Sequence, residues 1–357
     1  MVKSRNSQIE FLRILSMIFI VLSHYTFHNG VNNYELPLGF NRFLLEISTL
    51  GNIGVIIFVM ISGYFFENKK TNDINMTKIF KLWCQVVFYS ITIYILLLKL
   101  GYIKFSFIEL IKNIFPITFK QYWFATAYFV LYLFIPFLNC FFNNIQKDIH
   151  LKFNIMLLII FSVLRTLTNQ DFYGSELIEF IMFYSFGIYI KKYLNKPTTK
   201  QRKINNICLV SSVAIIIISI IAFDIIGQKY SVIAQHSNYL LGRTSPLTIT
   251  IAITIFNIFS WKKPYSNTII NAISSTMFGV YLISDNKYIR RYLWKDWLKI
   301  PNYVHSNILI LHMIVSLITV FIICAFIDFL RIKLIEYPML KKMSIKAIKI
   351  TEQKKID

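Results

Sequence analysis

Long apolar runs alternate with short polar and basic loops along the whole chain. A hydrocarbon core of about 30 Å requires roughly 20 apolar residues per spanning helix. The fold class predicted from this pattern is an all-α, polytopic integral membrane bundle, and we expect residues 1–357 to form a single transmembrane domain. The apolar runs predict ten membrane-spanning helices at residues 9–27, 50–66, 79–98, 123–142, 153–168, 177–193, 204–227, 240–260, 268–284 and 307–330.

Two of the predicted loops carry apolar residues of their own. The segment 105–119 is too short to span a bilayer and contains Pro116, so we expect it to lie in the membrane interface or to re-enter. The segment 285–306 mixes arginines with Trp294 and Trp297, a composition typical of an interfacial amphipathic element. An aromatic anchor is its expected role, and a binding role is the alternative.

The composition excludes a soluble domain, because 56% of the residues are hydrophobic and only 15% are charged. Positively charged short loops stay in the cytoplasm. Placing the N-terminus inside puts most of the 38 Lys and Arg residues in cytoplasmic loops. We therefore predict that both termini are cytoplasmic, with a tail at about 331–357. The expected location is a bacterial cytoplasmic membrane.

The net charge of +21 could also suggest nucleic acid as a partner. A basic excess that is spread over alternate loops between apolar runs is a topology signal rather than a binding patch. We therefore expect membrane lipids, and no nucleic acid, as partners. The four cysteines lie in or beside apolar runs without close pairs, so they are expected to be packing residues, and no metal site is predicted.

The first predicted helix carries three titratable side chains, Glu10, Arg13 and His24. Such residues are costly inside a membrane, so they usually face a protein-lined interior and have a function there. Eleven residues at 100° each bring His24 to within about 20° of the face that carries Arg13, roughly 16 Å further along the axis. An imidazole can accept a proton from a hydroxyl near neutral pH.

Simpler interpretations exist for these residues. Arg13 could extend toward cytoplasmic water and pair with Glu10 one turn away. His24 is harder to explain as a packing residue, and we take it as the candidate for catalysis. His312 lies in another apolar run without a charged neighbour within one turn, so an interhelical hydrogen bond is its expected role.

Several motifs in order along the chain resemble those of the acyltransferase family 3 membrane proteins, which include O-acetyltransferases of surface polysaccharides. The first is Arg13 and His24 separated by ten residues. The others are FVMISGY at 58–64, YWFATAY at 122–128 followed by PFLN at 136–139, and FGVYLI at 278–283. Each motif alone is weak, but their order along ten predicted helices is specific.

The resemblance implies an enzyme that takes an acyl group, usually acetyl, from cytoplasmic acetyl-CoA and transfers it to a hydroxyl of a glycan. His24 matches the histidine that carries the chemistry, and Arg13 matches its arginine, with Glu10 included in the same group. Lys78 and Lys81 match an Arg-x-x-Arg pair placed to meet the phosphates of the coenzyme, and Arg13 is expected to hold the donor together with them. Lysine neutralises phosphate but lacks the bidentate fork of a guanidinium, and both lysines could also be ordinary positive-inside residues.

One position departs from the family pattern. Where the family often has a histidine, this chain has Ser284, followed by Asp285. A hydroxyl cannot take up a proton at neutral pH, so either this position supports the site, with Asp285 supplying polarity, or the activity is impaired. Tyr122 and Trp123 at the outer mouth could stack on a sugar face, although an aromatic belt also explains them.

Two further expectations concern packing and partners. The small residues Ser62 and Gly63 could let the second helix approach the first closely. The expected partners are a glycan acceptor and polysaccharide-biosynthesis proteins. A competing interpretation is a transporter, such as a flippase of lipid-linked sugars, in which broken helices and paired halves would be expected; neither is evident in the sequence.

Overall fold

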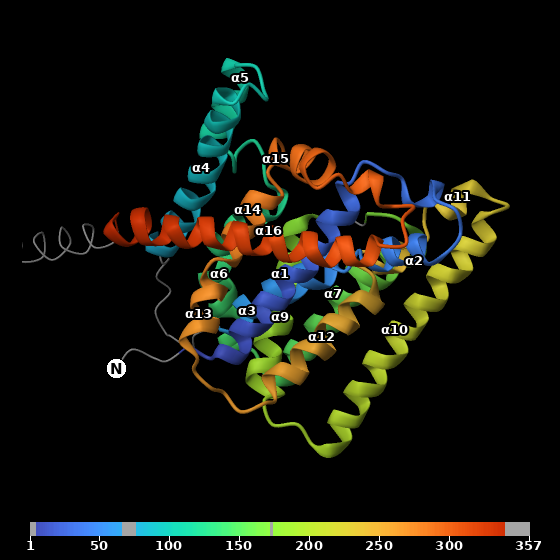
Figure 1. Ribbon diagram of the computed structural model, residues 1–357. Helices are drawn as coiled ribbons and strands as arrows, with labels where there is room; N and C mark the ends of the chain where they lie inside the picture. Colours follow the sequence, from blue (N-terminus) through green and yellow to red (C-terminus); the bar gives the residue numbers. More distant parts are fainter. Residues whose placement is uncertain (1–4, 66–75, 172–173, 340–357) are drawn as a thin grey trace, which may run out of the picture.

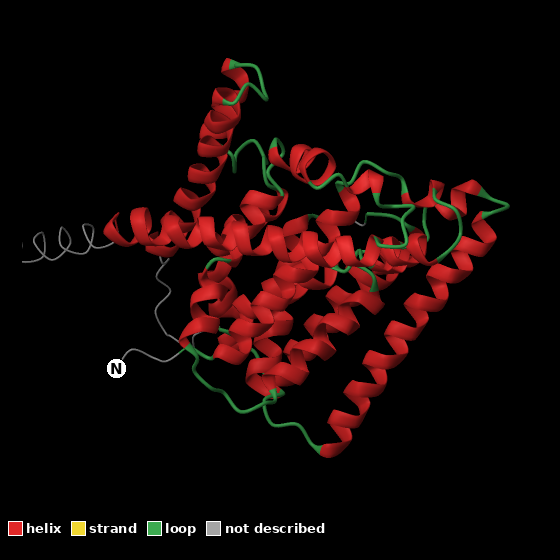
Figure 2. Ribbon diagram, in the orientation of Figure 1, coloured by secondary structure: helices red, strands yellow, loops and turns green. Residues whose placement is uncertain are grey.

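The computed structural model describes residues 5–65, 76–171 and 174–339. Within these residues every regular element is helical and no strand occurs, as Figure 2 shows. The α-helices are α1 (Ser7–Phe27), α2 (Phe40–Ile47), α3 (Gly51–Tyr64), α4 (Met76–Lys99), α5 (Phe107–Ile114), α6 (Trp123–Asn144), α7 (Lys147–Leu158), α8 (Arg165–Thr168), α9 (Glu176–Tyr193), α10 (Thr199–Gly227), α11 (Ser231–Ala234), α12 (Pro246–Ser260), α13 (Thr268–Ser275), α14 (Met277–Ser284), α15 (Ile289–Arg291) and α16 (Leu309–Arg331).

All ten predicted spans coincide with helices, and the expectation of an all-α polytopic membrane bundle is confirmed. Among the described residues, eight helical stretches are long and apolar enough to cross a bilayer, and a shorter apolar one is formed by α13 and α14 together. The remaining predicted span is α9, which carries two glutamates in its first turn and two lysines in its last. Residue 66, the predicted end of the second span, lies outside the described residues.

Helices α1 and α3 form the centre of the bundle (Figure 1). α1 packs against α3, α12, α13, α14 and α16, while α3 is held between α1 and α9. The spans that contain α1 and α3 are the most deeply buried of the eight. α10 packs mainly on α12 and lies at the edge of the molecule in Figure 1. Titratable residues on α1 therefore lie inside protein and not against lipid.

Glycines allow α3 to pack closely on both of its neighbours. A Cβ atom at Gly54 would lie 2.3 Å from the backbone oxygen of Ser16 on α1. A Cβ at Gly63 would lie 2.0 Å from the backbone oxygen of Tyr184 on α9. The expectation of a close approach to the first helix was wrong for Gly63, which faces α9. The close approach to α1 is made by Gly54, which lies nine residues, or about two and a half turns, earlier and therefore on the opposite side of the helix.

The two apolar loops form short helical elements. The segment 105–119 contains α5, which is too short to span and lies at the far end of α4 in Figure 1. The segment 285–306 contains α15, a π-helical turn (Tyr292–Trp297) and a 3₁₀ turn (Ile300–Asn302). Trp297 is half exposed, as expected of an anchor, but Trp294 is fully buried. The expectation of an aromatic anchor was therefore wrong for Trp294, which packs inside the protein.

The loops assigned to one side of the membrane contact one another. On the predicted cytoplasmic side, the Trp261 indole donates to the backbone oxygen of Leu194 (2.7 Å). On the predicted outer side, Lys120 pairs with Glu176 (2.7 Å). The loops thus separate into two groups at opposite ends of the bundle, as an alternating topology requires, whereas which end is cytoplasmic stays a prediction.

Candidate active site

His24 lies near the C-terminal end of α1. This helix begins at a capping residue, Asn6, whose side chain accepts a hydrogen bond from the backbone N–H of Gln8 (3.2 Å). It ends at His28, whose N–H bonds to the backbone oxygen of His24. His24 is only 9% exposed, and its ring faces the end of α14, so the imidazole is enclosed by protein rather than by lipid.

Both ring nitrogens of His24 face polar atoms at the end of α14. Nδ1 lies 3.3 Å from the Oγ atom of Ser284, and Nε2 lies 3.9 Å from Oδ1 of Asp285. The Ser284 hydroxyl can donate to the backbone oxygen of Tyr281 (3.5 Å), which leaves its oxygen free to accept from Nδ1–H. We therefore assign the proton to Nδ1 and the lone pair to Nε2. The 3.9 Å separation is too long for a direct hydrogen bond.

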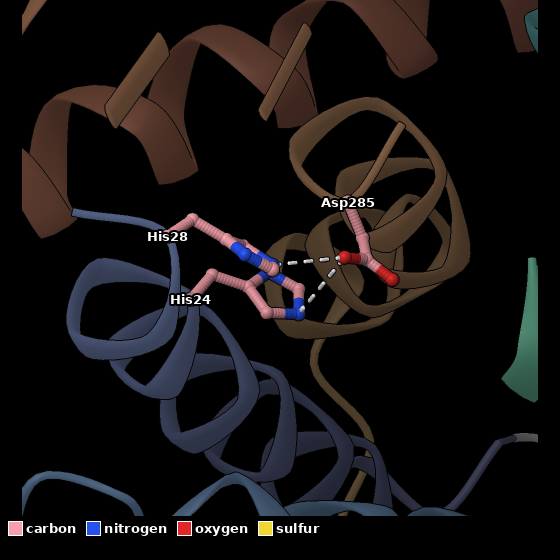
Figure 3. A group of neighbouring side chains, drawn as sticks. All are labelled: His24, His28 and Asp285. Atoms are coloured by element: carbon pink, nitrogen blue, oxygen red, sulfur yellow. Dashed lines mark hydrogen bonds and ion pairs between the residues drawn. The ribbon is translucent and has the colours of Figure 1, made fainter. Parts of the chain in front are cut away.

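His28 completes the group, as Figure 3 shows. It follows His24 by four residues at the C-cap of α1, and its Nε2 lies 3.2 Å from the same Asp285 oxygen. The two imidazole rings are 5.4 Å apart. Sequence reasoning missed His28, although the spacing of four residues from His24 places both on one face and could have revealed it.

Aromatic side chains form the walls around His24. Trp294 and Tyr281 each lie with their ring centroids 6.4 Å from the imidazole. The Trp294 indole donates to the backbone oxygen of Ser284 (3.4 Å), which ties the segment after α14 back to the helix end. Such walls exclude water and strengthen electrostatic interactions inside the site. Sequence reasoning did not assign Trp294 to the site, because the residue lies in a loop.

The residues that follow Asp285 are anchored to other elements. Asn286 donates to the hydroxyl of Tyr122 (2.6 Å). Lys287 pairs with Glu109 on α5, and the Tyr288 hydroxyl donates to the same carboxylate (2.7 Å). Hydrogen bonds from Lys287, Tyr288 and Lys112 lower the pKa of Glu109 to about 2. The turn that positions the Asp285 carboxylate is thereby fixed at neutral pH.

The two aromatic residues considered for sugar stacking occupy different environments. Tyr122 is only 2% exposed and supports the turn through Asn286. Trp123 packs its ring against the guanidinium of Arg243, whose carbon lies 4.5 Å from the ring centroid. Arg243 is in turn held by Glu179 (2.5 Å). Tyr122 thus lies beside the site, whereas the contacts of Trp123 are with a separate ion-pair group.

Arg13 and Glu10 form an ion pair of 2.5 Å near the other end of α1. Ser274 at the end of α13 donates to the same Glu10 oxygen, and the Arg13 guanidinium lies 6.0 Å from the ring of Phe58. Arg13 and His24 therefore both face the α13–α14 unit, in agreement with the face predicted by their spacing. Arg13 does not touch His24, so any role in chemistry at the imidazole is indirect or involves an extended substrate.

Comparison of the sequence with protein-family models identifies the family. A family model described as an acyltransferase domain, of the acyltransferase family 3, matches residues 6–329. The chain belongs to this family. Searches of curated proteins and of solved structures found no match. The protein is thus a multi-pass membrane acyltransferase, and the helices that carry Arg13, His24, Ser284 and Asp285 all lie inside the matched region.

The acyltransferase also has a polar cavity of about 470 Å³ at its predicted cytoplasmic end. Lys81 lines this cavity and pairs with Glu336 (2.5 Å). Lys78 lies in the first turn of α4 and is exposed. The two lysines are therefore at the same end as Arg13, as expected for residues that would meet a donor from the cytoplasm, while their role stays a prediction.

His24, His28 and Asp285 together also have the composition of a metal site. One ligand atom from each of His24, His28 and Asp285 lies within 4.8 Å of the others, and imidazole and carboxylate are ligands that zinc accepts. The sequence predicted no metal, and that expectation stays a prediction. The proposed proton transfer at His24 needs only the side chains of the acyltransferase.

The other titratable residues considered in the sequence have structural contacts. The Tyr25 hydroxyl lies 2.9 Å from Nδ1 of His312, and Nε2 of the same ring lies 3.0 Å from the backbone oxygen of Leu298. The expected interhelical role of His312 is confirmed. All four cysteines are free, as expected for packing residues, although Cys140 is exposed on its helix.

Proposed function

We propose that this acyltransferase transfers an acyl group, acetyl in the simplest case, from cytoplasmic acyl-CoA to a hydroxyl of a surface or secreted glycan. The protein would act in the bacterial cytoplasmic membrane beside the proteins that make the polysaccharide. The observation that carries this proposal is the enclosed imidazole of His24, held by Ser284 on one nitrogen and facing Asp285 with the other. A buried base of this kind serves proton transfer rather than packing.

His24 acts in this proposal as the general base. Its Nε2 lone pair takes the proton of the acceptor hydroxyl while the oxygen attacks the thioester carbonyl. The C–O bond of the new ester forms, the C–S bond breaks, and the imidazolium returns its proton to the thiolate of coenzyme A. Asp285 stabilises the transient imidazolium, because its carboxylate oxygen lies 3.9 Å from Nε2. His28 holds the same oxygen at 3.2 Å and so acts as a positioning residue.

A covalent route uses the same atoms in two steps. Nε2 of His24 would attack the thioester, release the thiolate and carry the acyl group as an acyl-imidazole, which the acceptor then displaces. Direct transfer needs both substrates in one site, whereas the covalent route permits them to enter in turn. Hydroxylamine-sensitive labelling of His24 by radiolabelled acetyl-CoA, without acceptor, would identify the covalent route.

Ser284 supports the base in this arrangement. Where the family often has a histidine, the serine accepts a hydrogen bond from Nδ1 of His24 and fixes the tautomer that exposes Nε2. A serine is sufficient for that task, because it does not have to take up a proton. The departure from the family pattern is therefore compatible with an active enzyme, with Asp285 as the charged partner.

Replacing His24, the proposed base, in cells tests the proposed function. His24→Ala should abolish acylation of the surface glycan while the amount of exported glycan stays normal, since only the transfer step is lost. Mass spectrometry of the glycan measures this as loss of the mass of one acyl group per modified sugar. His236→Ala, at an exposed histidine, is the matched control and should retain acylation. Loss of export in His24→Ala would instead favour the flippase interpretation.

A further inference from the structure

Two histidines at the predicted outer end of α1 face one carboxylate oxygen. His24 and His28 are four residues apart, which places them on the same face of the helix. Nε2 of His28 lies 3.2 Å from Oδ1 of Asp285, and Nε2 of His24 lies 3.9 Å from the same oxygen (Figure 3). One ligand atom from each of the three residues lies within 4.8 Å of the others. Three metal-binding groups from two helix ends thus converge on one small space.

The spacing of these atoms is close to that of a zinc site. Zinc binds imidazole nitrogen and carboxylate oxygen at about 2.0–2.2 Å in a tetrahedron, so its ligand atoms are about 3.3–3.6 Å apart. The separation between His28 and Asp285 already has about this value, and that between His24 and Asp285 exceeds it by roughly half an ångström. His28 is the C-cap residue of α1 and its side chain is 21% exposed, so its ring has room to move toward His24.

The ring of His24 has the orientation of a metal ligand. A histidine that binds a metal through one nitrogen usually donates a hydrogen bond from the other nitrogen. Nδ1 of His24 lies 3.3 Å from Oγ of Ser284, which directs the Nε2 lone pair toward Asp285. The Trp294 indole donates to the backbone oxygen of Ser284 (3.4 Å) and holds this residue in place. The ring is therefore oriented before an ion arrives, which lowers the entropy cost of binding.

The surroundings supply one negative charge and a route for an ion. With both imidazoles neutral, the carboxylate of Asp285 gives the three ligands a charge of −1, which favours a cation. Arg290 opposes binding, because its Nη1 lies 3.8 Å from Oδ1 of Asp285, but its side chain is 44% exposed and can turn toward water. His28 is the most exposed of the three ligands. An ion would therefore enter past His28, from the predicted outer side of the membrane.

We propose that His24, His28 and Asp285 bind one zinc ion from the outer side, with a water molecule as the fourth ligand, and that bound zinc inhibits acyl transfer. The ion takes the lone pair of Nε2 of His24, so this nitrogen can no longer accept the proton of the acceptor hydroxyl. Zinc is an inhibitor in this proposal and not a cofactor, so the transfer step itself needs no metal. The inhibition rests on the proposed function, whereas the binding of the metal does not.

Cobalt absorption tests the site without any chemistry. Co²⁺ replaces zinc in such sites and absorbs visible light when four-coordinate. We would titrate it into the full chain in detergent, free of bound metal and of a polyhistidine tag. One Co²⁺ per chain should bind, and zinc should displace it. His28→Gln should weaken binding at least about tenfold, since even the loss of a residue that only supports a metal ligand costs that much.

The matched control for this titration is His236→Gln, which replaces an exposed histidine in another predicted outer loop. It should bind cobalt as the wild type does, because His236 is not among the three ligands. Equal cobalt binding by His28→Gln and the wild type would overturn the proposal.

Arg290→Gln has the opposite sign and keeps all three ligands. Removing the positive charge beside Oδ1 of Asp285 should tighten cobalt binding about threefold, the scale of a partly exposed charge pair. Arg291→Gln removes the same charge from the exposed neighbouring residue and should leave binding unchanged. Unchanged or weaker binding in Arg290→Gln would show that the ion does not lie beside this carboxylate.

Inhibition is measured separately, as acyl transfer by the purified protein to a soluble acceptor sugar. Zinc should stop transfer by the wild type at the concentration that displaces cobalt, and removal of zinc with EDTA should restore it. The residual transfer by His28→Gln should be insensitive to the same zinc concentration. Magnesium prefers oxygen ligands and should inhibit neither protein. Zinc that raises the rate of transfer would overturn the inhibition.

The metal site and the proposed function fail in different ways. Cobalt binding that depends on His28, with no acyl transfer in the absence of zinc, would leave the metal site standing and contradict the proposed function. Active transfer by a protein that binds no cobalt would overturn the metal site and leave the proposed function intact. Normal transfer in saturating zinc, with cobalt binding as expected, would contradict both the inhibition and the role of Nε2 of His24 as the base.

Discussion

Asp285 is the charged group that gives the buried imidazole of His24 its environment. Its carboxylate is held by His28 at 3.2 Å and lies beyond hydrogen-bond distance of His24. A base that gains a proton in a site walled by Trp294 and Tyr281 creates a positive charge with little water to solvate it. In the proposed mechanism, the carboxylate offsets that charge in the transition state more than in the ground state and so accelerates the reaction.

We therefore predict that Asp285→Asn lowers kcat by about 10²- to 10⁴-fold, the usual contribution of a group that supports proton transfer. The KM for acyl-CoA should change little, because the proposed role of Asp285 is to stabilise the imidazolium and not to bind the donor. Acyl transfer to a water-soluble acceptor sugar by the purified protein measures both constants. Asp296→Asn, at an exposed aspartate, is the control. A normal kcat in Asp285→Asn would show that the carboxylate has no part in the transfer step.

The sequence identified His24 and Arg13 because a titratable residue inside an apolar run is conspicuous and helical spacing is regular. It also named Ser284 and Asp285, but only through a resemblance. It could not show that His28 and Asp285 meet, because a contact across more than 250 residues depends on how α1 and α14 pack, and the pattern of one helix does not define its neighbour. The burial of Trp294 could not be predicted either, because its contacts with His24 and Ser284 depend on the same packing.

At the scale of elements, α5 acts as an outer support for the site. It is a short amphipathic helix beyond the end of α4, with Phe107 and Ile108 exposed. Its Glu109 accepts hydrogen bonds from Lys287 and Tyr288, which lie two and three residues after Asp285. The sequence predicted a short interfacial element here but not its partner, since the carboxylate and the two donors lie in different loops.

The stability supplied by this support should depend on pH. The folded protein lowers the pKa of Glu109 from 4.5 to about 2, so the carboxylate contributes stability that is complete above about pH 4.5 and is lost as the pH falls toward 2. Glu109→Gln should therefore lower Tm at about pH 6, and the difference from the wild type should shrink on acidification below pH 4.5. Tryptophan fluorescence during heating in detergent measures Tm.

The control for this prediction is Glu35→Gln, which removes an exposed carboxylate outside the α5 contacts. A Tm difference between Glu109→Gln and the wild type that stays constant down to pH 3 would contradict the linkage. An additional loss of acyl transfer in Glu109→Gln at neutral pH would indicate that the support also positions Asp285.

At the scale of the whole molecule, apolar run length predicted the order and approximate bounds of ten helical segments, and eight helical stretches among the described residues are long and apolar enough to cross a bilayer. The bounds hold because the bilayer requires about 20 apolar residues regardless of neighbours. Run length did not predict two features of the helices. α13 and α14 are separate helices within one predicted span, and α2 lies in a predicted loop. These features depend on individual side-chain contacts, such as the one between Ser274 and Glu10. Hydropathy averaged over a window of residues does not detect such contacts.

The sidedness of the bundle is a prediction from the lysine and arginine distribution, and it is testable by labelling. In a variant with the four native cysteines replaced by serine or alanine, Lys104→Cys should react with a membrane-impermeant maleimide in intact cells, because this exposed residue lies in a predicted outer loop. Lys200→Cys, at the predicted cytoplasmic end, should react only after the cells are opened. The reverse pattern would invert the molecule and place the cavity beside Lys81 outside.

The turn after α14 has a consequence for how this protein can vary. Four consecutive residues, Asp285 to Tyr288, contact three groups from other elements. Asp285 contacts an imidazole, Asn286 contacts a phenol, and Lys287 and Tyr288 both contact one carboxylate. An insertion of even one residue here would break at least one of these ties and displace the aspartate from His24. Natural length differences among close homologues should therefore be absent from this turn and accumulate in connections without such ties.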